Sequence, residues 1–148
     1  MRLERFIVDT KVQGGGMSID FQIEVKTNYV QFTCQGTYSN QAILKVYGSA
    51  LGIATSEGKN AALIDIRALK GEPPAEMERF DLGVRVAKLQ SGHSARIWIA
   101  AVGSEPIIDP NRFVENVAAN RGARIKVFTD IDLAVAWIES KTKGTNTD

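Results

Sequence analysis

The fold is decided by residues 18–36, which read SIDFQIEVKTNYVQFTCQG. Apolar and polar residues alternate in this stretch, first from Ile19 to Val25 and again from Val30 to Cys34. A period of two is typical of half-buried β-strands, and Thr27-Asn28 supplies the tight turn between them. We therefore expect a β-hairpin with an apolar face and a polar face, the latter either wet or covered by hydrophilic groups.

The pattern then changes to helical spacing interrupted by short apolar runs. Helices are predicted in four segments: from Ser39 or Asn40 to about Glu57, from Pro73-Pro74 to Ser91-Gly92, from Asp109-Pro110 to Gly122, and after Asp130. Buried strands are predicted at Ala61–Ile66, Arg96–Val102 and Arg124–Phe128. The order β-β-α-β-α-β-α-β-α predicts an α/β fold with a mixed, mostly parallel sheet and an N-terminal β-hairpin.

The spacing within the first two helices also predicts which residues face the core. The inward positions of the first helix are Ile43, Val46, Tyr47, Ala50 and Ala54. Those of the second helix are Met77, Phe80, Val84 and Ala87. Gly48 and Gly52 lie one turn apart in the first helix, and we expect them to allow close packing of this helix on the sheet.

The two ends of the chain differ from the predicted domain at residues 17–140. Residues 1–16 surround one short apolar patch with charges and end in three glycines. We favour a flexible arm here, and the alternative is an extra strand that pairs with a sheet edge, including that of another subunit. Residues 141–148 are polar and are expected to form a disordered tail.

Composition excludes several classes of protein. The chain has 148 residues with 18 Lys and Arg against 17 Asp and Glu, which suits a single domain with no net field to attract nucleic acid or anionic lipid. Its longest apolar run, Ile97–Val102, is too short for a membrane span, and the charges in the first eleven residues argue against a signal peptide. We expect a cytoplasmic protein.

Reactive side chains are scarce. Cys34 shares the apolar face of its strand and His93 lies in a turn, so we expect a buried, inert thiol and a solvent-exposed imidazole rather than a catalytic pair. Asp130 and Asp132 are better explained as helix-capping residues than as metal ligands. The Gly-rich segment around Gly58 lacks the spacing of a phosphate-binding loop. No catalytic, cofactor-binding or metal-binding residue is predicted.

Polar residues at the carboxyl ends of the predicted strands are candidates to face a ligand or a partner, because ligands of open α/β sheets collect there. These candidates are Asp65, Arg67, Lys70, Glu105 and Asp130. For Asp65 we favour hydrogen bonds to the loop backbone or an ion pair with Arg67. An enzyme would have to use four of these groups, and their spacing matches no catalytic arrangement. The four are Asp65, Arg67, Glu105 and Asp130.

The stretch from Met17 to Ile138 resembles the SpoIIAA-like group, relatives of the STAS domains. The matching segments are Val30–Gly36, Leu63–Arg67, Asn120–Gly122, Val127–Asp130 and the Ala134, Ala136 and Trp137-Ile138 positions. The resemblance implies a SpoIIAA-like fold, similar also to CRAL-TRIO lipid-binding domains, and the binding of proteins or small ligands. STAS domains that antagonise anti-sigma factors carry a phosphorylatable serine after the buried strand, but residues 67–74 read RALKGEPP and lack Ser and Thr.

These observations predict a non-enzymatic regulatory or protein-interaction module. It would form a homodimer or a partner complex through the polar hairpin face or the N-terminal arm. The alternative is a carrier of a small amphipathic or lipid-like ligand, with an apolar cavity reached past the loops around Lys70 and Glu105.

Overall fold

A computed structural model describes residues 5–14, 17–93 and 96–143, with side chains from residue 19 onward. One six-stranded sheet has the spatial order β1-β2-β3-β4-β5-β6. Its strands are β1 (Arg5–Gly14), β2 (Met17–Val25), β3 (Val30–Thr37), β4 (Ala61–Lys70), β5 (Trp98–Val102) and β6 (Ile125–Phe128). Strands β1 to β3 are antiparallel neighbours, and β3 to β6 run parallel. The predicted α/β class with a mixed sheet is confirmed.

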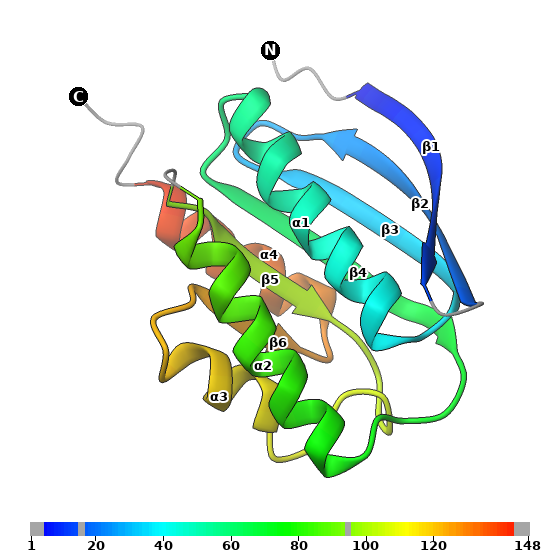
Figure 1. Cartoon of the computed structure of the whole chain (residues 1–148). Coiled ribbons are helices and arrows are strands. Elements are labelled where there is room, and N and C mark those ends of the chain that lie inside the picture. The colour runs from blue at the N-terminus through cyan, green and yellow to red at the C-terminus, as the bar shows by residue number, and fades with distance from the viewer. Residues whose placement is uncertain (1–4, 15–16, 94–95, 144–148) are drawn as a thin grey trace.

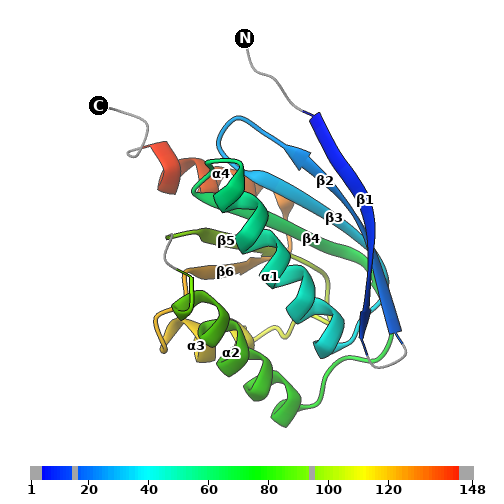
Figure 2. The ribbon, with the colours of Figure 1, turned by 45° about the horizontal axis from the view of Figure 1, so that its top comes forward.

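Four helices cover the two faces of this sheet unequally (Figures 1 and 2). They are α1 (Asn40–Ser56), α2 (Glu76–Ser91), α3 (Phe113–Ala119) and α4 (Ile131–Thr142). The first three lie on one face and contribute to one large core cluster, whereas α4 packs on the opposite face of β4, β5 and β6. None of the helices in the described residues has the length and apolar character that crossing a membrane requires.

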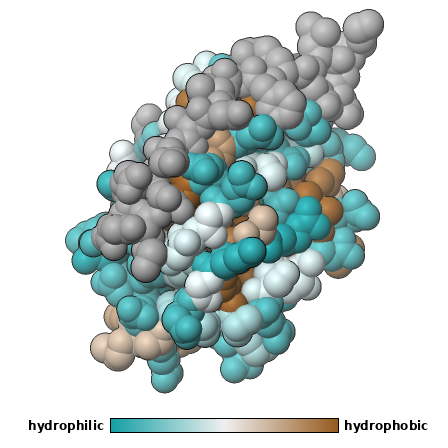
Figure 3. Space-filling view, turned by 90° about the vertical axis from the view of Figure 1, so that its right-hand side faces the viewer, coloured by the Kyte–Doolittle hydropathy of each residue, from teal (hydrophilic) through white to brown (hydrophobic). Residues whose placement is uncertain are grey.

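Strands β4 and β5 are buried on both faces, which explains their continuous apolar runs. In β4, Ala62 and Ile64 face the core under α1 and α2, while Leu63 faces α4. In β5, Ile99 and Ala100 divide between the two cores in the same way. The hairpin strands differ, because Gln22, Thr33 and Gln35 of β2 and β3 are exposed, as their alternation predicts. The side of the molecule in Figure 3 is mainly hydrophilic in its described part.

The favoured interpretation of residues 1–16 as a flexible arm is wrong for Arg5–Gly14. These residues form β1, which pairs antiparallel with β2 of the same chain, with an irregularity between Phe6 and Asp9. The edge of β2 presents unpaired backbone N–H and C=O groups, and a neighbouring strand satisfies them. The extra strand named as the alternative is therefore the one observed, within the chain itself.

Strand β4 continues four residues beyond the predicted end at Ile66, so Arg67 to Lys70 belong to a strand rather than a loop. Against two steps on β3, from Thr33 to Gln35, β4 advances three, from Asp65 to Ala68. This extra residue is a β-bulge, which bends a strand without ending its pairing. The charged residues Arg67 and Lys70 made this part of the chain look like a loop, although Leu69 between them is buried.

The predicted inward positions of α2 are partly wrong. Met77 is 78% exposed and Phe80 is 41% exposed, whereas the buried residues are Leu82, Gly83, Val86 and Ala87. The glycine prediction also changes, because nothing lies within 4 Å of a Cβ built on Gly48 or Gly52. Gly83 is the helical glycine that needs its missing side chain, since a Cβ there would lie 2.7 Å from Val117 on α3.

The last two helices have one boundary each that differs from the prediction. Helix α3 begins at Phe113 rather than at Asp109-Pro110, and the Asp109 carboxylate instead accepts a hydrogen bond from the Phe113 N–H at 3.1 Å. Helix α4 extends to Thr142, into the predicted tail. Thr142 is buried and its hydroxyl donates to the Ile138 carbonyl, which stabilises the last turn. Residues 144–148 of the predicted tail lie outside the described residues.

Candidate ligand pocket

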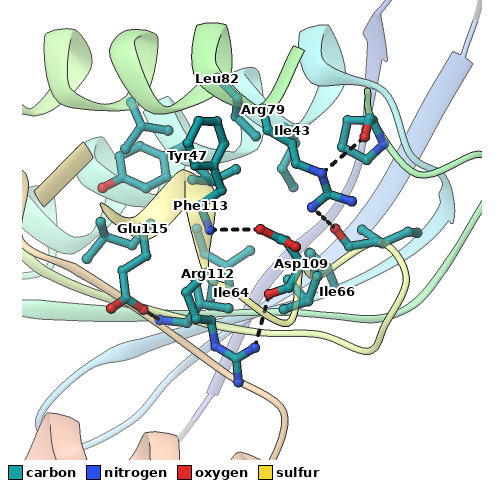
Figure 4. Close-up of a pocket in the computed structure, with 18 of the residues that line it drawn as sticks. Ile43, Tyr47, Ile64, Ile66, Arg79, Leu82, Asp109, Arg112, Phe113 and Glu115 are labelled. Atoms are coloured by element: carbon teal, nitrogen blue, oxygen red, sulfur yellow. Dashed lines mark hydrogen bonds between the residues drawn. The ribbon is translucent and has the colours of Figure 1, made fainter. Parts of the chain in front are cut away.

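The helices on the α1–α3 face leave an apolar pocket of about 80 Å³ above the sheet (Figure 4). The parallel strands form its floor, α1 and α2 form its roof, and α3 with the loop before it forms one side. Its wall is formed by Tyr38, Ile43, Tyr47, Ile64, Ile66, Pro74, Arg79, Leu82, Val86, Ala101, Ile107, Ile108, Asp109, Arg112, Phe113, Val114, Glu115, Ile125 and Val127. The surface inside the pocket is almost entirely apolar.

The pocket has two causes. The side chain below it is small, and the helices above it are held away from the sheet by their contacts with each other. Ala101 of β5 lines the pocket, between Ile64 of β4 and the edge strand β6. Helix α2 is held by the close contact of Gly83 with α3, so it is not free to settle onto the alanine. The pocket is therefore a consequence of packing between elements, not of one unusual residue.

One polar group is buried in this apolar wall. Tyr47 on α1 is 4% exposed, and among the described residues its hydroxyl has no hydrogen-bond partner. Burial raises the pKa of Tyr47, so the phenol stays protonated at ordinary pH and keeps a hydrogen to donate. The other phenol of the wall differs, because the Tyr38 hydroxyl donates to the Asn40 Oδ1 at 2.7 Å.

Arg79 lies at the rim of the pocket and connects neighbouring segments of the chain by hydrogen bonds. Its Nε donates to the Pro74 carbonyl at 3.1 Å, and its two terminal nitrogens donate to the carbonyls of Ile107 at 3.2 Å and Pro106 at 3.0 Å. These bonds tie α2 to the loop after β4 and to the loop after β5. The guanidinium therefore fixes the two loops that border the pocket, and all three of its nitrogens are engaged by backbone.

The remaining charged groups of the wall are also held by backbone. Arg112 has a left-handed conformation with φ 55°, and its Nη1 donates to the Asp109 carbonyl at 3.2 Å. The Asp109 carboxylate accepts from Phe113, and the Glu115 carboxylate accepts from the Val127 N–H at 2.7 Å (Figure 4). Glu115 thus satisfies a backbone donor of β6, the edge strand of the sheet.

Three of the residues singled out from sequence gather elsewhere, on the α4 side at the strand ends. Arg67 forms a bidentate pair with Asp65, with nitrogen–oxygen distances of 3.0 and 2.8 Å, and its backbone N–H also donates to Asp65. The pKa of Arg67 is raised first by this hydrogen-bonded pair and further by Asp130 and Asp132. Asp130 caps α4, as predicted, by accepting from the Asp132 and Leu133 N–H groups. The ion pair and the helix cap therefore account for Asp65, Arg67 and Asp130 as residues that stabilise the fold.

Lys70 and Glu105 lie apart from that cluster, and both are exposed. Lys70 ends β4, and Glu105 precedes Pro106 across a cis peptide bond. None of the five candidates lines the pocket. The loops that follow Lys70 and Glu105 do border it, through Pro74 and through Ile107 to Asp109.

The thiol of Cys34 and the imidazole of His93 lie in different surroundings. Cys34 is 1% exposed, which confirms that the thiol is buried, and burial, with a smaller contribution from Asp65, raises its pKa to about 12. His93 is half-buried rather than solvent-exposed, because its Nε2 lies 3.1 Å from both the Thr55 hydroxyl and the Leu51 carbonyl of α1. No group of three or more potential metal ligands occurs in the described part of the chain.

Sequence reasoning placed Tyr47 on the inward face of its helix but did not single it out. A tyrosine in an apolar stripe has the pattern of an ordinary core residue, and so does Ala101 in an apolar strand. The polar residues of the chain drew attention to the strand ends instead. Searches of family models and of curated proteins find no match to this chain.

Proposed function

We propose that this domain binds a small amphipathic or lipid-like ligand, with the apolar part of the ligand in the pocket above β4 and β5. The observation on which this rests is the open apolar pocket between the sheet and helices α1 to α3. A concave, mostly apolar lining with few polar groups is typical of small-molecule sites, and at about 80 Å³ this pocket would enclose only part of a ligand. The hydrogen bonds of Arg79 support the proposal, because they tie both loops that border the pocket to α2.

The direct test is a titration of the isotope-labelled protein with 1-hexanol, followed by amide chemical shifts. We expect saturable shifts at pocket residues such as Ala101 and Val86. The variant Ala101→Leu fills the floor of the pocket and should lose most of this binding while it stays folded. Ala136→Leu adds the same atoms at an exposed position of α4 and should bind as the wild type does.

A wild type that shows no saturable shifts would overturn the proposal. The same would follow from an Ala101→Leu variant that binds 1-hexanol as tightly as Ala136→Leu does. Native mass spectrometry of the protein purified without denaturation adds a second measurement, because a retained ligand appears as a discrete mass increase.

The second candidate function is a regulatory or protein-interaction module, which would act as a homodimer or with a partner protein. A surface groove of about 590 Å³ between α1 and α2 favours it. Leu44, Gly48 and Leu89 supply the apolar part of this groove, and Lys45, Arg85 and Lys88 supply its charges. The same native mass spectrum gives the subunit count, and Leu89→Asp should reduce any dimer. A strictly monomeric protein that captures no partner would contradict this function.

A further inference from the structure

We propose that a second surface of this domain, on the α4 side of the sheet, binds the phosphate backbone of a single strand of nucleic acid. This surface, the basic-aromatic cluster, consists of three cations around three aromatic rings, which are Arg124, Lys126 and Lys141 around Trp98, Phe128 and Trp137. It lies across the sheet from the pocket, so this inference does not rest on the proposed function.

The aromatic rings of the cluster hold the three cations close together. The Arg124 guanidinium lies 4.5 Å from the centre of the Trp98 ring, and the Lys141 ammonium lies 4.9 Å from the same ring centre. The Lys126 ammonium lies 5.9 Å from the centre of the Phe128 ring. The three rings form a continuous series with centroids 5.7 and 5.8 Å apart, so the three charges share one surface.

These cations keep their full charge for a ligand. In the part of the chain that the structure describes, no carboxylate lies within ion-pair distance of any of the three. Glu139, the carboxylate closest in sequence to Lys141, instead accepts a hydrogen bond from the Asn28 side chain at 2.7 Å. An ion pair would cancel the charge, whereas an aromatic ring attracts a cation without neutralising it. The N–H groups can therefore donate to phosphate oxygens.

Positive charge is concentrated in this cluster although the whole chain is almost neutral. The net charge of the chain is +1, so the chain outside the cluster is net negative. The total charge gives the protein no general attraction for nucleic acid, but a local concentration attracts a polyanion over about a Debye length. A nucleic-acid strand carries one phosphate per nucleotide, roughly 3.4 Å apart along a stacked strand. Neighbouring phosphates can therefore reach all three cations.

An anionic membrane suits this surface less well than a nucleic-acid strand does. Trp98 and Trp137 are half-buried between the sheet and α4, so their rings are not free to insert into a bilayer. The exposed apolar residue of α4 is Leu133, and it lies next to Asp132, whose negative charge opposes anionic lipid. A single strand needs no insertion, because its phosphates supply most of the attraction.

The test uses intrinsic fluorescence, because both tryptophans of the chain lie in the cluster. We expect unlabelled oligothymidylate to change the fluorescence saturably at low salt. Three phosphate contacts correspond to a slope of about −2 when the logarithm of the association constant is plotted against that of the salt concentration. Lys126→Gln and Lys141→Gln should each weaken binding about fivefold at low salt and reduce the steepness of this slope by about 0.7.

Lys70→Gln is the matched control, because it removes the charge of an exposed lysine at the far end of β4 from Trp98. This variant should bind as the wild type does, and circular dichroism checks that all three variants are folded. The inference is wrong if oligothymidylate leaves the fluorescence of the wild type unchanged. It is also wrong if Lys70→Gln weakens binding as much as the two cluster variants do.

Vesicles of equal parts phosphatidylcholine and phosphatidylserine test the membrane with the same fluorescence signal. We expect no saturable change with these vesicles. A change with the vesicles and none with oligothymidylate would assign the cluster to an anionic membrane and overturn the inference.

Discussion

The two faces of the sheet at β4 and β5 both bury apolar side chains, but they fill the space above the sheet differently. On the α4 face, Trp98 and Trp137 meet edge to face with ring centroids 5.7 Å apart, and Phe128 lies 5.8 Å from Trp137. Lys141 lies 4.9 Å from the centre of the Trp98 ring and extends this packing to the surface. On the α1–α3 face, aliphatic side chains together with the rings of Tyr38, Tyr47 and Phe113 surround a pocket.

The difference shows how one strand can serve two cores with opposite properties. Aromatic rings from β5, β6 and α4 fill the α4 face, because a single helix can move towards the sheet until its side chains pack closely. The other face has three helices whose positions are linked by Gly83 at Val117 and by the Arg79 bonds. These mutual constraints prevent the helices from closing the gap. Four predictions test this contrast, from the largest effect to the smallest.

The largest effect is expected from truncating an isoleucine on each face. Ile138 of α4 is fully buried, so Ile138→Ala should lower the free energy of unfolding by about 2–5 kcal/mol. Ile43 of α1 is half-buried and borders the pocket, and Ile43→Ala should cost clearly less because fewer contacts are lost. Urea denaturation followed by circular dichroism measures both. Equal losses would mean that the two faces are equally well packed.

The next prediction uses two neighbouring alanines of β5. Ala100 is fully buried on the α4 face, so Ala100→Leu should overpack that core and destabilise the domain by about 1–3 kcal/mol. Ala101 points into the pocket, so Ala101→Leu should be neutral or stabilising. Thermal unfolding of the two variants gives the comparison. A loss for Ala101→Leu as large as that for Ala100→Leu would contradict an available cavity.

The order of strands and helices along the chain could be predicted from the sequence, because the patterns that indicate each element are local. The alternation around Phe21 and Phe32 and the continuous run Ala61–Ile66 each report the burial of their own strand. Ser39 and Gly58 mark the ends of α1 as predicted, by a side-chain cap and by a positive φ of 72°. β1 was harder to predict, because pairing with β2 depends on a distant edge rather than on its own pattern.

An apolar cavity was predicted only for the ligand-carrier alternative, and the residues that line the pocket could not be predicted, because they depend on how three helices meet. No local pattern tells that Gly83, rather than Gly48, is the point of closest helix contact. Similarly, the pairing of Asp65 with Arg67 was expected, but the bulge that accompanies it was not. The resemblance to SpoIIAA-like domains stays a prediction, and a ligand-binding function agrees with part of what it implies.

The two pocket tyrosines should respond with opposite signs to the same substitution. Tyr47→Phe removes a buried hydroxyl that has no partner within the described part of the chain and should stabilise the ligand-free protein by ~1 kcal/mol. Tyr38→Phe removes the donor to the Asn40 Oδ1 and should destabilise it by ~1 kcal/mol. The measurement is the urea concentration at the midpoint of unfolding, compared between variants with equal m-values. A destabilised Tyr47→Phe variant would show that this hydroxyl is satisfied in the free protein.

The smallest effect concerns Cys34, which shares the large core with the pocket but lies in its packed part. Its folded pKa of about 12 exceeds the usual 9.0, so the unfolded chain releases this proton at lower pH than the folded chain does. The resulting contribution to stability is intact well below pH 9.0 and falls as pH rises from there towards 12. At pH 9.0 we expect the free energy of unfolding of the wild type to have fallen by ~0.4 kcal/mol more than that of Cys34→Ala.

Alkylation by iodoacetamide provides a more sensitive measurement of the same property. The folded protein should react only as fast as it opens, because the thiol is both buried and protonated. Ligand probes that enter the pocket should leave this rate unchanged apart from their general stabilisation of the fold. Rapid alkylation of the native protein at pH 8 would show that the open space extends under α1 to β3, and the contrast between a local pocket and a packed remainder would then be wrong.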